Sequence, residues 1–289
     1  MGDLPALPPQ VKLGVVGCPI AHSLSPPMQQ AALDAAGLPV RYVRLLCERE
    51  GQAFAGMVAA LRAAGFAGAN VTVPFKKQAY ALADEADALS RLCGASNTLV
   101  FSESGIRAFN TDGPGFERAV YELCGRRLHE MRVLLLGACG GAGVALAAQC
   151  VLAGCPDLTL ANRPRPELAE LAATLGQPAP GCVRAVPMGT PELAAAAARA
   201  DLVVNATSLG LAEGDALPLD PALLHAGQVV YDLITHASTP LVRAAQACGC
   251  TAAGGQSMLL WQGALAFEHW FGRLPDIAAM RRALEAAAR

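Results

Sequence analysis

The sequence predicts an α/β protein built from two domains. Short apolar strands alternate with alanine-rich helices along almost the whole chain, a pattern typical of parallel βαβ units. The alternation stops at a polar stretch, 126–131, and begins again behind it with an apolar strand and a glycine-rich turn. At 289 residues the chain is long enough for two ordinary domains. We therefore expect an N-terminal α/β domain followed by a second, doubly wound one.

The composition excludes several classes of protein. Hydrophobic residues make up 53% of the chain and charged residues 16%, so a buried core is expected and disorder is not. The net charge of -2 has no basic block, which gives no support for nucleic-acid binding. No apolar run reaches about 18 residues, and the proline-rich start lacks the features of a signal peptide. We expect a cytoplasmic protein without a membrane span.

The cysteines and histidines do not predict a metal site. The ten cysteines are scattered without a C-x-x-C pair, and none of the five histidines has metal-ligand spacing to another. We expect small buried thiols in a reducing compartment.

A hydroxyl-rich loop follows the first strand, which is expected at 11–17. Ser25 precedes Pro26, which predicts that Ser25 is the N-cap of a helix with proline at its first position. Ser23 has no such role, and two hydroxyls at a strand end suit a polyhydroxylated ligand. Capping and ligand binding both remain open for Ser25.

A lysine lies directly behind the end of a later strand. After a helix at 27–36, a strand at 40–46, a helix at 52–64 and a strand at 66–71, the chain reads Asn-Val-Thr-Val-Pro-Phe-Lys. Pro74 ends the strand, and Lys76 comes directly behind it. A lysine there is either a proton donor at the mouth of a cleft or a surface cation at a helix start.

A hairpin is expected between 97 and 110, with a turn at 102–105. Asp84, Glu85 and Asp87 before it are expected on a solvated helix face. Asn97 is either a turn residue or a ligand contact. Asp112 is either the cap of a helix at 115–123 or part of a site.

The second half of the chain contains the frame of a dinucleotide-binding unit. A strand at 133–136 leads into Gly-Ala-Cys-Gly-Gly-Ala-Gly, then a helix to about 153 and a strand at 158–161. In such a frame, phosphates lie on backbone N–H groups at the helix N-terminus. The central glycine of the usual G-x-G-x-x-A pattern is Cys139 here. No Gly-Lys-Ser/Thr follows, which excludes a P-loop.

The second strand of this unit ends in Asn162 and Arg163, with Arg165 close by. An acidic residue there would hold a ribose hydroxyl and favour NAD, whereas arginine suits a 2′-phosphate. NADP is therefore the expected cofactor. Further strands at 183–186, 202–205 and 229–233 and a helix at 191–199 continue the pattern, and a polar loop, 205–210, lies on the edge where open α/β sheets bind ligands.

Two helices are expected in 254–289. Gln262 lies among apolar neighbours and needs hydrogen-bond partners, which a ligand would supply. His269 is expected to be a partly buried structural residue.

These blocks together resemble the shikimate dehydrogenase family. The matching segments follow family order and span nearly the whole chain: 17–26, 70–76, 97–99, 110–113, 205–207 and 258–262. The resemblance implies a substrate domain formed by 1–112, with the segment 254–289 returning to it. It also implies a Rossmann-like NADP domain at 113–253, and a cleft between the two domains. It implies reversible NADP-dependent reduction of 3-dehydroshikimate to shikimate, by a monomer or a homodimer.

The resemblance also implies roles for individual residues. Lys76 and Asp112 would be the catalytic pair. The substrate would be held by Ser23, Ser25, Thr72, Asn97, Asp112, Gln262 and Thr235. The cofactor would be held by Gly137, Ala138, Cys139, Gly140, Gly141, Ala142, Asn162, Arg163, Arg165, Thr207, Leu233 and Ser257.

Six positions depart from the family's usual residues and indicate a divergent member. They are Gln29 for His, Ser96 for Val, Cys139 for Gly, Glu167 for a basic residue, Thr235 for Tyr and Ser257 for Gly. Two other functions therefore stay open. One is a related dehydrogenase acting on quinate or a similar acid, with NAD or NADP. The other is a catalytically silent sensor of such acids.

Overall fold

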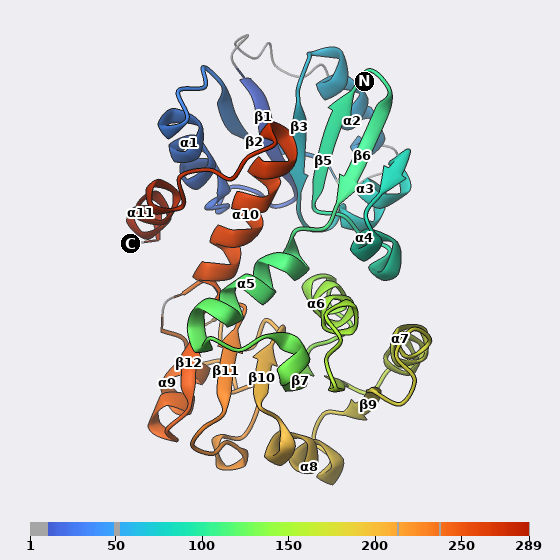
Figure 1. The fold of residues 1–289 in the computed structure, drawn as a ribbon, viewed down its shortest axis with the longest axis vertical. Coiled ribbons are helices and arrows are strands. Elements are labelled where there is room, and N and C mark those ends of the chain that lie inside the picture. Colours follow the sequence, from blue (N-terminus) through green and yellow to red (C-terminus); the bar gives the residue numbers. More distant parts are fainter. Residues whose placement is uncertain (1–10, 49–52, 213, 237, 289) are drawn as a thin grey trace. The chain divides into compact units, whose positions relative to one another are not determined.

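The chain forms two compact units, each with its own sheet (Figure 1). The structure is a computed structural model, and it describes residues 11–48, 53–212, 214–236 and 238–288. The first unit runs to Thr111 and includes the chain again from Leu260, and the second is Asp112–Leu259. The first border, 111/112, lies one residue before the expected 112/113, and the second border, 259/260, lies six residues after the expected 253/254. The assignment of substrate and cofactor to the two units stays a prediction.

The first unit contains a mixed six-stranded sheet in the order β2-β1-β3-β5-β6-β4. β1, β2 and β3 are parallel, whereas β5 is antiparallel to both β3 and β6. The expected hairpin is confirmed as β5 and β6. The strands are β1 (Val11–Gly17), β2 (Arg41–Leu46), β3 (Gly68–Val71), β4 (Glu85–Ala86), β5 (Thr98–Ser102) and β6 (Gly105–Phe109).

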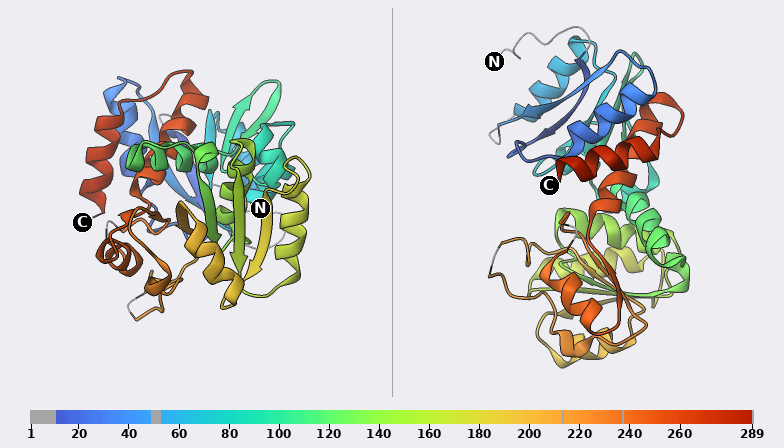
Figure 2. Two further views of the ribbon diagram at one scale, coloured as in Figure 1. Left: turned by 60° about the horizontal axis from the view of Figure 1, so that its bottom comes forward. Right: turned by 90° about the vertical axis from the view of Figure 1, so that its left-hand side faces the viewer.

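Helices on this sheet bury its apolar side chains. Those preceding α10 are α1 (Ser25–Ala35), α2 (Ala53–Ala63), α3 (Lys76–Ala81) and α4 (Ala88–Cys93). α10 (Gln256–Phe271) crosses the border between the units, and α11 (Ile277–Ala287) packs beside α1 (Figure 2, right). Phe54 of α2 stacks on Phe75 with ring centroids 5.0 Å apart, within one core cluster that also contains Val71 and Leu99.

The second unit contains an all-parallel sheet in the order β12-β11-β10-β7-β8-β9. Counted from β7, this is the order 3-2-1-4-5-6 of a Rossmann fold, and the expected doubly wound domain is confirmed. The strands are β7 (Arg132–Leu136), β8 (Asp157–Asn162), β9 (Val183–Pro187), β10 (Leu202–Asn205), β11 (Val229–Asp232) and β12 (Thr251–Ala253).

Helices cover both faces of this sheet, as its continuous apolar strands require. α5 and α6 pack together, while α8 and α9 share a core cluster with Leu134 and Val203 of the central strands. The helices are α5 (Asp112–Cys124), α6 (Gly141–Leu152), α7 (Pro166–Gly176), α8 (Pro191–Arg199) and α9 (Pro240–Ala247), with short 3-10 turns at Leu128–Glu130 and Pro221–Leu223.

Three expectations about local structure were wrong. Ser25 is the first residue of α1 and not its cap: the N-cap is Leu24, and Ser25 donates its own N–H to Ser23 Oγ at 3.3 Å. Asp112 lies in the first turn of α5, which begins three residues earlier than expected. The 84–87 segment is not a helix face, because Asp84 accepts the N–H of Ile106 at 2.7 Å and Asp87 caps α4 by accepting from Ser90 at 2.7 Å.

No helix in the described part of the chain is long and apolar enough to cross a membrane. Within that same part, no group of three or more His, Cys, Asp or Glu side chains is arranged to hold a metal ion.

His269 is a partly buried structural residue, as expected. Its ring stacks on Phe109 with centroids 3.8 Å apart. Burial lowers the pKa of His269, and the nearby carboxylates of Asp87 and Glu268 oppose that shift. The neutral ring is therefore the form that stabilises the first unit.

This lowered pKa predicts a pH-dependent stability. In the unfolded chain His269 takes up its proton near pH 6.5, before the folded protein does, so the stability present above that pH is lost as the pH falls toward the folded pKa. His269→Phe keeps a ring on Phe109 and removes the proton. We expect the free energy of unfolding of wild type, measured by urea denaturation between pH 7.5 and 5, to fall more steeply than that of the variant. Parallel curves would contradict this assignment.

Candidate functional site

The candidate substrate residues of the first unit lie at one edge of its sheet. β1 and β3 are parallel and end there, while β5 begins there because it is antiparallel to β3, with Asn70 opposite Thr98. β6 returns to the same edge, where Phe109 accepts the N–H of Asn97 at 3.0 Å. The loops and helix starts that carry the candidates Ser23, Ser25, Thr72, Lys76 and Asn97 all lie at this edge, as does Thr111, which precedes the candidate Asp112.

The loops after β1 and β3 are in direct contact. Thr72 donates its N–H to Val16 O at 2.9 Å, and Cys18 donates to Val73 O at 3.0 Å. A Cβ on Gly17 would lie 2.4 Å from Thr72 Cγ2, so glycine is what lets the two loops approach this closely. Both loops contain a cis proline, Pro19 and Pro74.

Lys76 is fixed at the first position of α3. Phe75, its N-cap, is buried and anchors the turn in the core. Ser96 donates its N–H to Lys76 O at 2.9 Å, which ties the lysine backbone to the residue before Asn97. The Lys76 side chain is half-buried. A cation on a fixed backbone at a strand-end edge is the arrangement that a positioned proton donor requires.

The side chain of Asn97 connects several elements of the first unit. Its Oδ1 accepts the N–H of Thr111 at 2.8 Å, and its Nδ2 donates to Thr111 Oγ1 at 3.0 Å and to Gln262 Oε1 at 3.4 Å. Gln262 is on α10, 165 residues away along the chain. Asn97 is 3% exposed and is therefore a network residue as well as a candidate contact.

Three members of this network were missed by the sequence analysis. Tyr42 donates its hydroxyl to Asn70 Oδ1 at 2.7 Å, and Asn70 Nδ2 donates to Thr98 Oγ1 at 3.0 Å. Burial raises the pKa of Tyr42 well above its ordinary value, which keeps it a donor. The available signal was a polar Asn70 in a strand whose other residues are apolar or glycine.

In the second unit, a tight turn follows β7. Gly137 has φ +79° and donates its N–H to Ala161 O at 2.8 Å. A Cβ there would lie 2.8 Å from the backbone of Ala206 and Thr207, so only glycine fits. Gly140 is the N-cap of α6 and has no side chain to satisfy the first N–H groups of that helix. N–H groups without a capping side chain at a helix N-terminus favour a bound anion, which suits this turn to the predicted phosphate contact.

The glycine that lets α6 approach β7 is Gly143, which the sequence analysis did not select. A Cβ on Gly143 would lie 2.4 Å from Gly137 O and 2.8 Å from Ala138 O. Gly141 has open space around its Cβ position. Cys139, at the usual glycine position, is partly buried, and burial raises the pKa of its thiol.

A buried polar cluster holds the loop after β10. Asn205 Oδ1 accepts from Thr207 N at 3.0 Å and Thr207 Oγ1 at 2.6 Å, while its Nδ2 donates to Asp232 at 3.0 Å. Asp232 also accepts from Thr239 Oγ1 at 2.7 Å and Ile234 N at 3.2 Å. Burial raises the pKa of Asp232, and these hydrogen bonds oppose the shift. The cluster fixes Thr207 beside the glycine turn.

Ser257 is bonded within the second unit. Its hydroxyl lies 2.9 Å from Tyr231 Oη, which also accepts the N–H of Met258 at 3.0 Å. Burial raises the pKa of Tyr231 to about 12. Leu233 donates its N–H to Asn205 O at 2.9 Å, and Thr235, two residues on, is half-buried.

The end of β8 presents two exposed arginines, Arg163 and Arg165, next to Asn162. Arg165 is bound by Glu167 through two contacts, Nε–Oε2 at 3.1 Å and Nη2–Oε1 at 3.3 Å. The hydrogen bond from Arg165 lowers the pKa of Glu167, so the carboxylate is ionised. An anion on Arg165 therefore has a competitor within the chain.

The residues of this edge fit a dinucleotide. The positive-φ glycine, the open N-terminus of α6 and the arginines at the end of β8 supply the turn, the diphosphate site and a phosphate contact, in the places where a Rossmann fold needs them.

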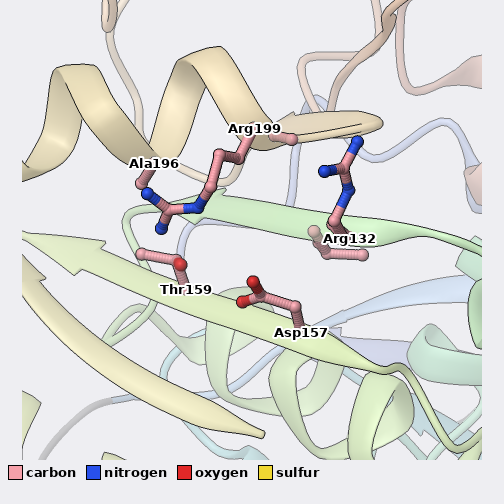
Figure 3. A pocket seen from close by; sticks show the side chains of 7 residues that line it. Arg132, Asp157, Thr159, Ala196 and Arg199 are labelled. Atoms are coloured by element: carbon pink, nitrogen blue, oxygen red, sulfur yellow. The ribbon is translucent and has the colours of Figure 1, made fainter.

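A shallow hollow at the opposite edge of this sheet is not part of the site (Figure 3). It lies where β7 and β8 begin, and two of its three charged lining residues are in ion pairs: Arg132 with Asp201 at 2.9 Å, and Asp157 with Arg184. Its lining residues are Arg132, Val133, Asp157, Thr159, Ala196, Arg199 and Ala200.

Comparison with known proteins identifies the family. Residues 15–99 match the shikimate dehydrogenase substrate binding domain, and residues 255–285 match the shikimate 5'-dehydrogenase C-terminal domain. The chain is 42% identical to the shikimate dehydrogenase (NADP(+)) of Rubrobacter xylanophilus, over 94% of both chains. It belongs to the shikimate dehydrogenase family.

Two solved structures show the same fold. The shikimate 5-dehydrogenase of Thermus thermophilus in complex with NADP(H) and shikimate is 36% identical, with a TM-score of 0.84 over 96% of this chain and 99% of that one. The quinate dehydrogenase of Corynebacterium glutamicum in complex with NAD is 30% identical, with a TM-score of 0.87 over 96% and 99%. Solved structures similar to this chain thus include proteins named for either acid.

Replacement by alanine should have opposite effects at two glycines of α6, Gly143 and Gly141. Gly143→Ala places a Cβ against backbone oxygens that cannot move aside, and overpacking of this kind costs about 1–3 kcal/mol of unfolding free energy. Gly141→Ala, two residues earlier, meets no atom and gains helix propensity, so stability should be unchanged or slightly higher. Chemical denaturation of both variants checks this. Equal stabilities would show that Gly143 is not a packing glycine.

Proposed function

We propose that this chain catalyses the reversible NADP-dependent reduction of 3-dehydroshikimate to shikimate. The observation that carries the proposal is that Lys76, Asn97 and the segment with Ser23 and Ser25 lie at one strand-end edge of the first unit. The glycine turn of the second unit supplies the dinucleotide edge. Membership of the shikimate dehydrogenase family supports the assignment of the substrate to the first edge and of the dinucleotide to the second. We expect a cytoplasmic enzyme, monomeric or homodimeric, that acts in aromatic amino-acid biosynthesis.

Hydride delivery to the ketone, which the nicotinamide supplies when bound, leaves negative charge on the carbonyl oxygen. In the proposed mechanism the Lys76 ammonium donates a hydrogen bond and then its proton to that oxygen, which stabilises the developing charge. In the oxidative direction the neutral amine takes the hydroxyl proton back. Asp112 completes the catalytic pair by orienting the ammonium and contacting a substrate hydroxyl.

The remaining substrate contacts are proposed from the same edge. Ser23 and Thr72 offer hydroxyls on two loops that are bonded to each other, and Ser25 offers one at the start of α1. Asn97 and Gln262 offer amides whose Nδ2 and Oε1 atoms are 3.4 Å apart. Hydroxyls and amides both donate and accept, which suits a ring carrying several hydroxyls and a carboxylate. Thr235, in the second unit, takes the place of a larger phenol, so the apolar surface and the hydrogen-bond donor of that phenol are missing there.

Lys76 gives the first test of the mechanism. Lys76→Ala removes the proton donor, and loss of a positioned acid or base lowers kcat by about 10²- to 10⁴-fold. The KM for NADP should stay within about twofold, since no cofactor phosphate contact is lost. Lys77→Ala, an exposed neighbour on the same helix, is the matched control and should keep wild-type kcat. Near-normal turnover of the Lys76 variant in steady-state assays would overturn the assignment.

The Arg165–Glu167 pair gives a test of cofactor preference. If Arg165 holds the 2′-phosphate, Glu167→Gln frees its guanidinium and should lower the KM for NADP by about two- to fivefold, the scale of an exposed ion pair. The KM for NAD, which has no 2′-phosphate, should not change. Glu170→Gln makes the same charge change elsewhere on α7 and is the control. Equal changes for both cofactors would contradict the role of Arg165.

The second candidate function is that of a dehydrogenase for a related acid such as quinate. It is favoured by Thr235 and by Glu167, whose carboxylate competes with a 2′-phosphate for Arg165. Spectrophotometric assays of shikimate and quinate, each with NADP and NAD, decide between the two candidates. Highest kcat/KM for shikimate with NADP supports the proposal, and a preference for quinate or NAD supports the second candidate. Binding without turnover in all four would identify a silent sensor.

A further inference from the structure

Gln29 of α1 is buried, but of the two polar atoms of its amide only the nitrogen has a hydrogen-bond partner among the described residues. Its side chain is 1% exposed, and Nε2 donates to Gly263 O of α10 at 2.9 Å. Its Oε1 is buried and has no hydrogen-bond partner among the residues that the structure describes. The orientation of the amide follows from the bond itself, because Oε1 placed against the Gly263 carbonyl would be repelled. What Gln29 contributes is therefore one N–H donor.

That donor joins the two helices that carry candidate substrate contacts in the first unit. Gln29 lies one turn after Ser25 on the same face of α1. Gly263 is the residue after Gln262, whose Oε1 accepts from Asn97 at 3.4 Å. The bond thus fixes the backbone of Gln262 relative to both Ser25 and the Asn97 network.

The contact also depends on close packing. A Cβ on Gly263 would lie 2.4 Å from Met28 Cε and 3.3 Å from Gln29 Nε2, so α10 approaches α1 at a glycine. Separation of the helices here would move Gln262 without touching Lys76 directly.

We propose that Gln29 is a positioning residue for substrate binding, which acts by holding Gln262 through its hydrogen bond to Gly263. This inference rests on the proposed function, because it assigns the effect to the hydroxylated acid that Gln262 and Ser25 bind. It places control of substrate affinity in a residue that does not touch the substrate.

The test replaces the amide and follows substrate and cofactor separately. Gln29→Met keeps the volume and removes the donor, so the KM for shikimate should rise about three- to tenfold, the range for one lost hydrogen bond. The KM for NADP should not change. Gln29→His supplies an N–H donor at the same place and should recover most of the affinity. If the methionine variant leaves the KM for shikimate unchanged, or if histidine fails to restore it, the proposal is wrong.

Gln30→Met is the matched control. Gln30 is the next residue of α1 and also joins elements, through Asp34 at 2.7 Å, Val40 O at 3.2 Å and the N–H of Tyr42 at 3.1 Å. Its loss should lower the melting temperature at least as much as Gln29→Met and leave the KM for shikimate unchanged. An equal rise in that KM would make the effect a general loss of stability, and would overturn the proposal.

The outcome is separable from that of the proposed function. If wild type turns over neither shikimate nor 3-dehydroshikimate, the proposed function fails, and with it the substrate assigned to Gln29. If wild type is active and the Gln29 variants behave as Gln30→Met does, only the positioning role fails. Assays are run well below the melting temperature of the least stable variant, so that each comparison is made on folded protein.

Discussion

The first unit depends on the amide of Asn97. In one buried side chain it joins the start of β5, the chain after β6 and, across 165 residues, helix α10. A buried amide must have its hydrogen bonds satisfied, and here the partners are the residues that surround the proposed substrate site. The same hydrogen bonds therefore determine both the geometry of that site and the stability of the sheet edge. A change at Asn97 would disturb both.

The second unit repeats this arrangement with different residues. Asn205, also fully buried at a strand end, holds Thr207 on one side and Asp232 on the other. Asp232 in turn binds Thr239 and the N–H of Ile234. Each unit thus holds its candidate site loops with a buried asparagine at a strand terminus: Asn97 directly precedes β5, and Asn205 ends β10. The charged and flexible groups of the proposed chemistry are attached to this rigid frame.

The sequence predicted what depends on local pattern. Strand periodicity and turn residues placed the hairpin β5–β6, the parallel second sheet and the turn at Gly137, because these follow from neighbours in the chain. Contacts between distant segments were not predictable, among them Gln262 with Asn97 and Gln29 with Gly263. Local rules failed at Asp84, where a tertiary partner competed, because its carboxylate binds the backbone of Ile106. They also failed at Ser25, which begins α1 while the neighbouring Ser23 accepts its N–H. The packing role of Gly143 was not predictable either, because it depends on where the folded chain places the carbonyl of Gly137.

Four of the six departures from the family pattern are bonded within the chain. Gln29 binds Gly263, Ser96 Oγ donates to Ser90 Oγ at 2.8 Å, Glu167 binds Arg165, and Ser257 binds Tyr231. Of the four, Gln29 and Ser96 are buried. A buried polar group without a partner is costly, so the bonds of Gln29 Nε2 and Ser96 Oγ lower the cost of these two changes, while Gln29 Oε1 stays unsatisfied among the described residues. The bonds also limit their effects. Ser96 and Ser257 have their hydroxyls engaged inside a unit, whereas Glu167 competes directly for an arginine of the proposed cofactor site. Glu167 is therefore the departure with the most direct effect on ligand preference, and Gln29 acts through the backbone it holds.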